Sequence, residues 1–538
     1  MTAIGEPRTA PDVLPPDDDR APARTRRAAA PAPLLIGAIL VALLLVLPLA
    51  FLILEAAQDG YSTLRPLLFR SLTVTLLWNA VSLTVVVTAV CAVLGTLAAW
   101  FVERTDLPGH RIWAVLLVVP VGIPDFVTSF GWKSIFPSLG GFAGATLVMT
   151  LAVYPLVYLP VAASLRSVDP AQEEVARSLG LGRVTAFRRV TLAQVRPAVL
   201  GGCLLVALVT LSEYGAFEIL GFRTYTTEIY TEYLNGFDAP AACALSLMLV
   251  LLSLFVLTGE GLSRGGGRQS RSGPLAARVA RPHRLGRGKT PVLMGCFAVV
   301  GLALGVPVGA IIYWVLHGGT STLPSASILS AAGHTVFYSA VAGLVATLAA
   351  LPIAILSVRH AGRVSLLLER STYLVLAMPG LVIALALTYF SERYAAGFLY
   401  QSAAMLIAAY AIMFFPLALV AVRASVAHAP PGLEEVGRSL GRSRLEVLWR
   451  LTLPLVAPGL AAAFCLVFLE AMTELTATLV LIPTGAQTLA TQFWAFQTNI
   501  SYGQAAPYAG LMILIAALPS YMLGRWFNRL PARAQASA

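Results

Sequence analysis

The chain has 538 residues, of which 58% are hydrophobic and 12% are charged, and its mean hydropathy is +0.79. Roughly 45–50% of the residues in a soluble globular domain are apolar, so these values exclude that class and indicate an integral membrane protein. The formal net charge of +11 needs no nucleic-acid partner, because basic residues gather on one side of a membrane protein.

Apolar stretches of about 20 residues, the length that crosses a bilayer as a helix, recur along the chain. They predict an all-α integral membrane protein with about 12 transmembrane helices, six in each of two halves. The predicted spans of the first half are 33–55, 71–101, 112–131, 142–165, 196–220 and 241–259, and those of the second are 291–315, 330–358, 371–390, 399–422, 455–481 and 505–524.

The remaining segments are polar and are predicted to be cytoplasmic. The predicted parts are a disordered tail (1–32), a first half (33–259), a basic linker (260–290), a second half (291–528) and a short tail (529–538). With the N-terminus in the cytoplasm, all but five of the 37 Lys and Arg residues fall on the inner side. Short cytoplasmic loops of membrane proteins carry such an excess of Lys and Arg. Both termini are therefore expected inside. The basic residues of the linker fit the same preference for the inner side, and contact with anionic membrane lipid is the alternative interpretation.

An internal repeat relates the two halves. The segment EEVARSLGLGRVTAFRRVTLAQVRP (173–197) aligns without a gap with EEVGRSLGRSRLEVLWRLTLPLVAP (434–458), with 13 of 25 positions identical at a shift of 261. A slightly different shift pairs Pro120 with Pro379. Each copy follows the fourth predicted span of its half, so both copies face the cytoplasm and the halves are parallel repeats.

The repeated segment predicts a helix, a glycine turn and a second helix. In the first copy Glu173 falls in the first helical turn, where the helix dipole favours an acid, and Gly180 is suited to a left-handed helix end. A second short helix is expected at about 183–192. We call this unit of helix, glycine turn and helix an elbow. It presents a mixed polar and apolar surface on which a soluble protein can dock.

The pattern resembles the EAA loop of ABC importer permeases. Matching positions are Glu174, Val175, Ala176, Gly180, Val190 and Leu192 in the first copy, and Glu435, Val436, Gly437, Gly441, Leu451, Leu453 and Pro454 in the second. Ala193 stands where the family usually has Pro, which implies a looser first docking surface. The resemblance implies a type I ABC importer permease fold in a bacterial inner membrane, with an extracytoplasmic substrate-binding protein as a partner.

The same resemblance implies two separate ATP-binding subunits, one on each elbow, which use ATP and Mg²⁺. This chain is then neither an enzyme nor a binder of a cofactor. The coupling residues implied are Glu173, Glu174, Arg177, Gly180, Arg183, Glu434, Glu435, Arg438, Gly441 and Arg444. The segment GRGKT (286–290) lacks the preceding glycine of a phosphate-binding loop, so no nucleotide hydrolysis by the chain is expected.

The cargo is indicated by TELTATLVLIPTGAQTLATQFW (473–494), which resembles a stretch of ferric iron permeases. Thr473, Thr476 and Ile482 replace the Lys, Pro and Arg usual there. Thiamine permeases share the fused layout and are an alternative, and polyamine, phosphonate and sulfate importers use a similar loop. The six histidines show no metal-ligand spacing, so no resident metal site is predicted.

One carboxylate within the fifth predicted span of each half marks a candidate pathway. Glu213 and Glu474 are again 261 residues apart, and ionisable residues inside a membrane cost roughly 2.5–3.5 kcal/mol, which by default indicates function. With Tyr214 and Glu470 they are predicted to line the translocation pathway. The alternative is a hydrogen-bonded gate or packing residue that never touches cargo.

Two other classes of protein are less well supported. A secondary transporter also has parallel halves, but it does not need two near-identical charged loops. A membrane-embedded enzyme needs a nucleophile with a base or a metal-spaced set, and neither pattern occurs. The aromatic outer segments 221–238 and 483–504 fit either an interface belt or a surface for the binding protein.

Overall fold

The computed structural model describes residues 31–167, 170–236, 239–263, 283–318, 326–360, 362–395, 397–517 and 519. Within these residues the chain is helical, and the one β-bridge joins Thr105 to His283. The tail segments 1–30 and 520–538 and most of the predicted linker lie outside the described residues.

The helices of the first half follow the apolar stretches but are broken more often than predicted. They are α1 (Ala32–Leu68), α2 (Ser71–Arg104), α3 (His110–Leu116), η1 (Val119–Gly122), α4 (Asp125–Ile135), α5 (Gly141–Val153), α6 (Pro155–Ser167), α7 (Pro170–Ser178), α8 (Arg183–Ala186), η2 (Phe187–Thr191), α9 (Leu192–Ser212), α10 (Gly215–Leu220), α11 (Tyr225–Thr231), η3 (Glu232–Gly236) and α12 (Ala239–Ser263).

The second half begins with a short turn and repeats this order. Its elements are η4 (Gly286–Gly288), α13 (Lys289–Val300), η5 (Gly301–Gly305), α14 (Val306–His317), α15 (Ala326–Arg359), α16 (Arg363–Leu376), α17 (Gly380–Tyr394), α18 (Ala403–Met413), α19 (Phe415–His428), α20 (Pro431–Ser439), α21 (Arg444–Val447), η6 (Leu448–Thr452), α22 (Leu453–Thr473), α23 (Thr476–Leu481), α24 (Leu489–Thr498) and a last helix over 502–517.

These helices confirm the predicted all-α membrane fold. Eight described helical segments are long and apolar enough to cross a membrane, and three bent helix pairs bring the number to 11 if each pair is one span. The last predicted span, 505–524, overlaps the helix over 502–517 and continues beyond the described residues. Large apolar side chains such as Trp78 and Phe255 are more than 70% exposed on these helices, as expected of surfaces that face lipid.

Two of the bent pairs occupy equivalent places in the halves. The first pair bends by 92° before α4, and the second bends by 103° before α17. The N-cap residues of these helices are Pro124 and Pro379. The predicted pairing of Pro120 with Pro379 is therefore wrong: Pro120 lies in η1, one turn earlier, and Pro124 is the residue that starts the equivalent helix.

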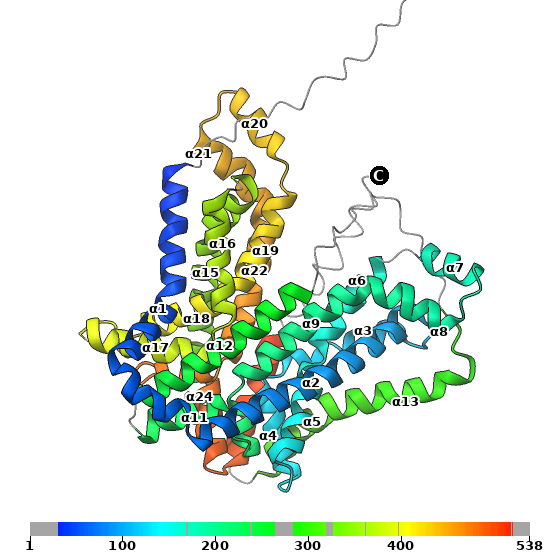
Figure 1. Cartoon of the computed structure of the whole chain (residues 1–538), viewed down its shortest axis with the longest axis horizontal. Helices are drawn as coiled ribbons and strands as arrows, with labels where there is room; N and C mark the ends of the chain where they lie inside the picture. Colours follow the sequence, from blue (N-terminus) through cyan, green and yellow to red (C-terminus); the bar gives the residue numbers. More distant parts are fainter. Residues whose placement is uncertain are drawn as a thin grey trace, which may run out of the picture.

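The halves exchange their first helices. Helix α1 lies against α15, α16 and α17 of the second half, and α14 lies against α4 of the first half (Figure 1). Each bundle is thus completed by a helix from the other half of the sequence. This exchange joins the halves through apolar surface and through the covalent chain.

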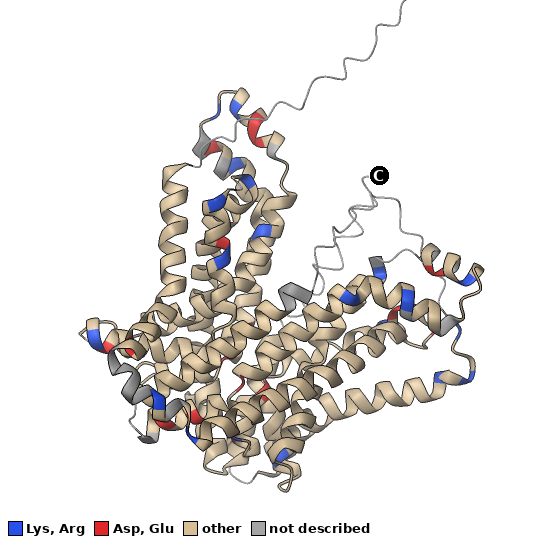
Figure 2. Cartoon of the chain, viewed as in Figure 1, with Lys and Arg blue, Asp and Glu red and all other residues tan. Residues whose placement is uncertain are grey.

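Two lobes result from this packing. They meet around α4, α11 and α24 and diverge toward two tips, one made by α7 and α8 and the other by α20 and α21 (Figure 1). Charged residues gather at the tips and along the opposite edge, while the helices between carry few (Figure 2). The charge distribution leaves an apolar zone between two polar surfaces, as a bilayer requires.

Candidate functional site

The two tips are built alike down to their helix ends. Helix α7 ends with the Leu181 N–H donating to the Ala176 carbonyl at 3.2 Å, and Gly180 has φ +88°. At the other tip Arg442 N–H donates to the Gly437 carbonyl at 3.2 Å, and Gly441 has φ +79°.

These bonds are the Schellman arrangement that ends a helix with a left-handed residue, a conformation costly for any residue with a Cβ. The predicted glycine turns are confirmed.

The second limb of each elbow is longer than predicted. The expected short helix at 183–192 does not end there, because α8, η2 and α9 follow one another with helical dihedral angles at both junctions. The three pieces hold 4, 5 and 21 residues, and their counterparts α21, η6 and α22 have the same lengths. At about 1.5 Å per residue each forms a rod of about 45 Å, which reaches from the elbow into the apolar zone.

The outward faces of the elbow helices expose apolar side chains outside the apolar zone. Leu179 and Leu440 are 78% and 75% exposed, and Val175 and Val436, one turn earlier, are 57% and 55% exposed. They lie at equivalent positions in polar tips, where lipid does not explain them. Exposed apolar residues within a polar surface are typical of surfaces that contact a protein partner.

The predicted coupling residues divide into an exposed set and a partly buried set. Arg177, Glu435 and Arg438 are exposed, whereas Glu173 and Glu434 are partly buried against the rest of the lobe. The side chains of Glu174, Arg183 and Arg444 lie outside the described part of the structure.

Different partners hold the two equivalent, partly buried acids, Glu173 and Glu434. The Thr191 hydroxyl donates to Glu173 Oε2 at 2.9 Å, and His283 Nε2 lies 3.3 Å from Glu173 Oε1. The hydrogen bond from His283 lowers the pKa of Glu173 below its ordinary value. In the second lobe Arg359 Nη2 lies 3.3 Å from Glu434 Oε1 and also donates to the Ala429 carbonyl at 2.7 Å.

A glutamate follows each rod at the end that lies away from the elbow. Glu213 and Glu474 were predicted to lie within a continuous fifth helix, which is wrong: α9 ends at Ser212, α22 ends at Thr473, and both glutamates have extended backbone angles. Each carboxylate accepts the N–H three residues on, from Ala216 at 2.7 Å and from Ala477 at 2.9 Å. Each glutamate lies one residue before the N-cap of the short helix α10 or α23 and satisfies a free N–H group of its first turn.

Two more carboxylates lie within electrostatic range of this pair. The charges of Asp125 and Glu474 both act on Glu213, and those of Asp125 and Glu474 act on Glu470. Asp125 is the first residue of α4, and its equivalent at the start of α17 is Gly380, whose Cβ position would lie 3.3 Å from Glu474 Oε1.

Sequence reasoning missed Asp125. The only signal was an acid directly after Pro124, at the start of a helix.

None of the four carboxylates is fully covered. Asp125, Glu213 and Glu474 are partly exposed, and Glu470, one turn before Glu474 on α22, is exposed. Among the described residues, no group of three His, Cys, Asp or Glu is placed to hold a metal ion together. The four side chains therefore present carboxylate oxygen atoms in the interior of the protein.

Tyr214, the other predicted pathway residue, packs between the halves. Its ring lies 4.6 Å from that of Tyr230 and 5.5 Å from that of Trp494, centroid to centroid, and its side chain is buried. Gly215 beside it packs on Leu475 of the second half, because a Cβ at Gly215 would lie 2.8 Å from a Leu475 methyl carbon.

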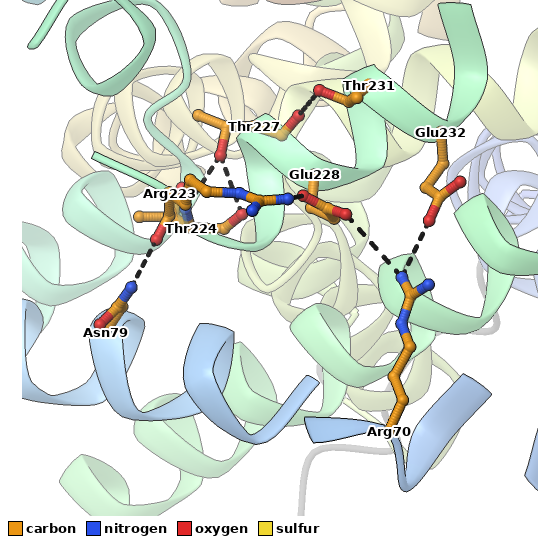
Figure 3. Close-up of polar contacts among 8 residues, drawn as sticks. All are labelled: Arg70, Asn79, Arg223, Thr224, Thr227, Glu228, Thr231 and Glu232. Atoms are coloured by element: carbon orange, nitrogen blue, oxygen red, sulfur yellow. Dashed lines mark hydrogen bonds and ion pairs between the residues drawn. The ribbon is translucent and has the colours of Figure 1, made fainter. Parts of the chain in front are cut away.

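An ion-pair network fixes residues 223–232, within the predicted outer segment of the first half (Figure 3). Arg223 and Arg70 reach Glu228 from different sides, at 2.8 and 3.9 Å, and Arg70 also pairs with Glu232 at 2.9 Å. Asn79 on α2 donates to the Arg223 carbonyl at 2.9 Å. This anchors the start of α11 to α2.

The second half repeats the anchor without the charges. His334 Nδ1 lies 3.0 Å from the Gln487 carbonyl oxygen, and α24, like α11, begins with a Thr-x-x-Thr capping box. The predicted outer segments of the two halves therefore share a geometry but differ in charge.

Two parallel, homologous helix bundles, each joining an exposed elbow to an interior carboxylate, define a two-half membrane permease. The family model described as "Binding-protein-dependent transport system inner membrane component" matches residues 91–259 and 346–535, once in each half. The chain belongs to this family, so it is a multi-pass membrane component of a transport system. The resemblance to ABC importer permeases is confirmed.

Several curated proteins are similar to the chain. The Fe(3+)-transport system permease protein FbpB 2 of Haemophilus influenzae is 38% identical over 91% of this chain and 97% of its own length. The ferric transport system permease protein FbpB of Actinobacillus pleuropneumoniae is 24% identical over 89% of this chain and 76% of its own length. The sulfate transport system permease protein CysT of Salmonella typhimurium is 29% identical over 40% of this chain and 86% of its own length.

Proposed function

We propose that this chain is the permease of an ATP-driven importer that takes ferric iron from an extracytoplasmic binding protein and releases it into the cytoplasm. The observation that carries the proposal is the pair of equivalent rods, each of which joins an exposed apolar elbow to a carboxylate at its far end. One ATP-binding subunit would dock on each elbow and hydrolyse ATP with Mg²⁺, and both elbows and both termini would face the cytoplasm.

The geometry supports a lever mechanism. The tips diverge while the lobes meet around α4, α11 and α24 (Figure 1). Subunits that close on ATP would draw the tips together, and the continuous helices would carry that rigid-body movement to Glu213 and Glu474. These residues lie at breaks in the helix, where small rotations change which way a capping side chain points.

Ferric iron is favoured as cargo by two independent observations. Relatives that match most of the chain are named as ferric iron permeases. Asp125, Glu213, Glu470 and Glu474 supply hard carboxylate oxygen atoms in the interior, which suit a hard cation. These side chains bring no positive charge for an anion such as sulfate, the substrate named for relatives that match 40% of the chain.

The test is reconstitution of the full chain in proteoliposomes with its ATP-binding subunit and binding protein. We expect uptake of radioactive ferric iron that requires ATP and all three components, with no uptake of sulfate or thiamine by the same vesicles. Transport without the ATP-binding subunit would overturn the proposed class, and ATP-driven uptake of another solute in place of iron would overturn the cargo.

A further inference from the structure

The end of the linker between the halves is fastened to the first lobe. The His283 N–H donates to the Arg104 carbonyl at 2.8 Å, and the Asp106 N–H donates to the His283 carbonyl at 3.1 Å. The Leu285 N–H then donates to Asp106 Oδ1 at 2.8 Å, and Lys289 Nζ lies 2.8 Å from Asp106 Oδ2. Residues 283–289 therefore form a clasp on the end of α2.

The clasp presents one side chain to the elbow. His283 Nε2 lies 3.3 Å from Glu173 Oε1, and both side chains are partly covered, at 30% and 15% exposure. The imidazole stacks on Trp100, with centroids 6.2 Å apart and 29° between planes, and Trp100 in turn contacts Phe187 of η2. The ring is thus held between the first and second limbs of the elbow.

In the second lobe the equivalent acid, Glu434, is held without any linker residue. Arg104 and Arg359 are the last residues of the equivalent helices α2 and α15. Arg359 pairs with Glu434 directly through its guanidinium. In the first lobe His283 and Thr191 both bond the acid, and the charge of Arg104 also acts on Glu173.

We propose that the linker end over 283–289 is a working part of the first docking elbow, in which His283 is a positioning residue that holds Glu173 and α7 as Arg359 holds Glu434 and α20. This inference rests on the proposed docking of ATP-binding subunits at the elbows. It makes the two docking sites inequivalent, because one depends on a segment of chain that exists only where the halves are fused.

Hydrogen–deuterium exchange of the full chain in lipid nanodiscs tests the inference at each elbow separately. In His283→Ala we expect amides of residues 172–181 to exchange about five-fold faster, with residues 433–442 unchanged. Arg359→Ala, the matched control, should reverse this pattern. His283→Arg should restore slow exchange at the first elbow, and adding Glu173→Gln to His283→Ala should cause little further change, because both remove the same contact.

Coupling to the motor gives a second readout. The His283→Ala permease with its ATP-binding subunit should consume more ATP per cargo imported, and His283→Arg should restore the ratio. Unchanged exchange at the first elbow, equal loosening of both elbows, or failure of Arg to restore either readout would overturn the inference. If the proposed function is wrong, the exchange pattern would still appear but no ATP-binding subunit would respond to it.

Discussion

Removing the exposed leucines of the elbows should weaken docking of the ATP-binding subunit. Leu179 and Leu440 are 78% and 75% exposed in the chain alone, and full burial of a leucine side chain stabilises by about 1.5–3 kcal/mol. Truncation to alanine removes most of that area, so each elbow should lose about 1–2 kcal/mol of docking free energy. This corresponds to about 5- to 30-fold in affinity per site.

The assay is binding of the purified ATP-binding subunit to the permease in nanodiscs, measured for each single variant and for the pair. Leu514→Ala is the matched control, because Leu514 is 70% exposed on the helix over 502–517, away from the elbows. We expect the control to bind as the unchanged protein does. Equal affinity of the Leu179→Ala and Leu440→Ala variants and this control would refute the docking surface.

Three further outcomes are expected. A Glu213→Gln and Glu474→Gln double variant keeps an oxygen for the Ala216 and Ala477 N–H groups but loses the carboxylates that can bind a cation, so iron uptake should fall about tenfold with little change in Tm; unchanged uptake would remove both residues from the pathway. Gly441→Pro cannot adopt φ +79°, so the protein should insert but not couple ATP hydrolysis to transport, and normal uptake would contradict the elbow assignment. The hydrogen bond from His283 lowers the folded-state pKa of Glu173 from 4.5, so its stabilising effect is present above pH 4.5 and lost as pH falls through the lowered pKa; exchange of α7 should accelerate over that range, and constant protection would count against this contact.

The elbows were predictable because short-range interactions build them. Glycine at a left-handed helix end, acids in the first turn and small residues at Ala176 and Gly437 leave their pattern in consecutive residues. At Gly437 a Cβ would lie 2.7 Å from a Leu451 methyl carbon, which explains why a small residue stands there. The shift of 261 then reproduces the bounds of α7 through α10 in α20 through α23.

The interior site was only half predictable. The repeat identified Glu213 and Glu474, because both halves kept the acid. It did not identify Asp125, because the equivalent residue is Gly380 and a carboxylate in one half alone leaves no repeat. The apolar pattern also hid the breaks after Ser212 and Thr473, since hydropathy does not register a side chain that caps the next short helix.

By itself the sequence determined the membrane class, the two parallel halves and the twin elbows, because bilayer thickness, charge asymmetry and helix capping act on neighbouring residues. Tertiary structure alone decided that α1 completes the second bundle, that Asp125 comes within range of Glu213, and that His283 reaches Glu173. These contacts join residues distant in the chain, and only the packing of the lobes brings them together.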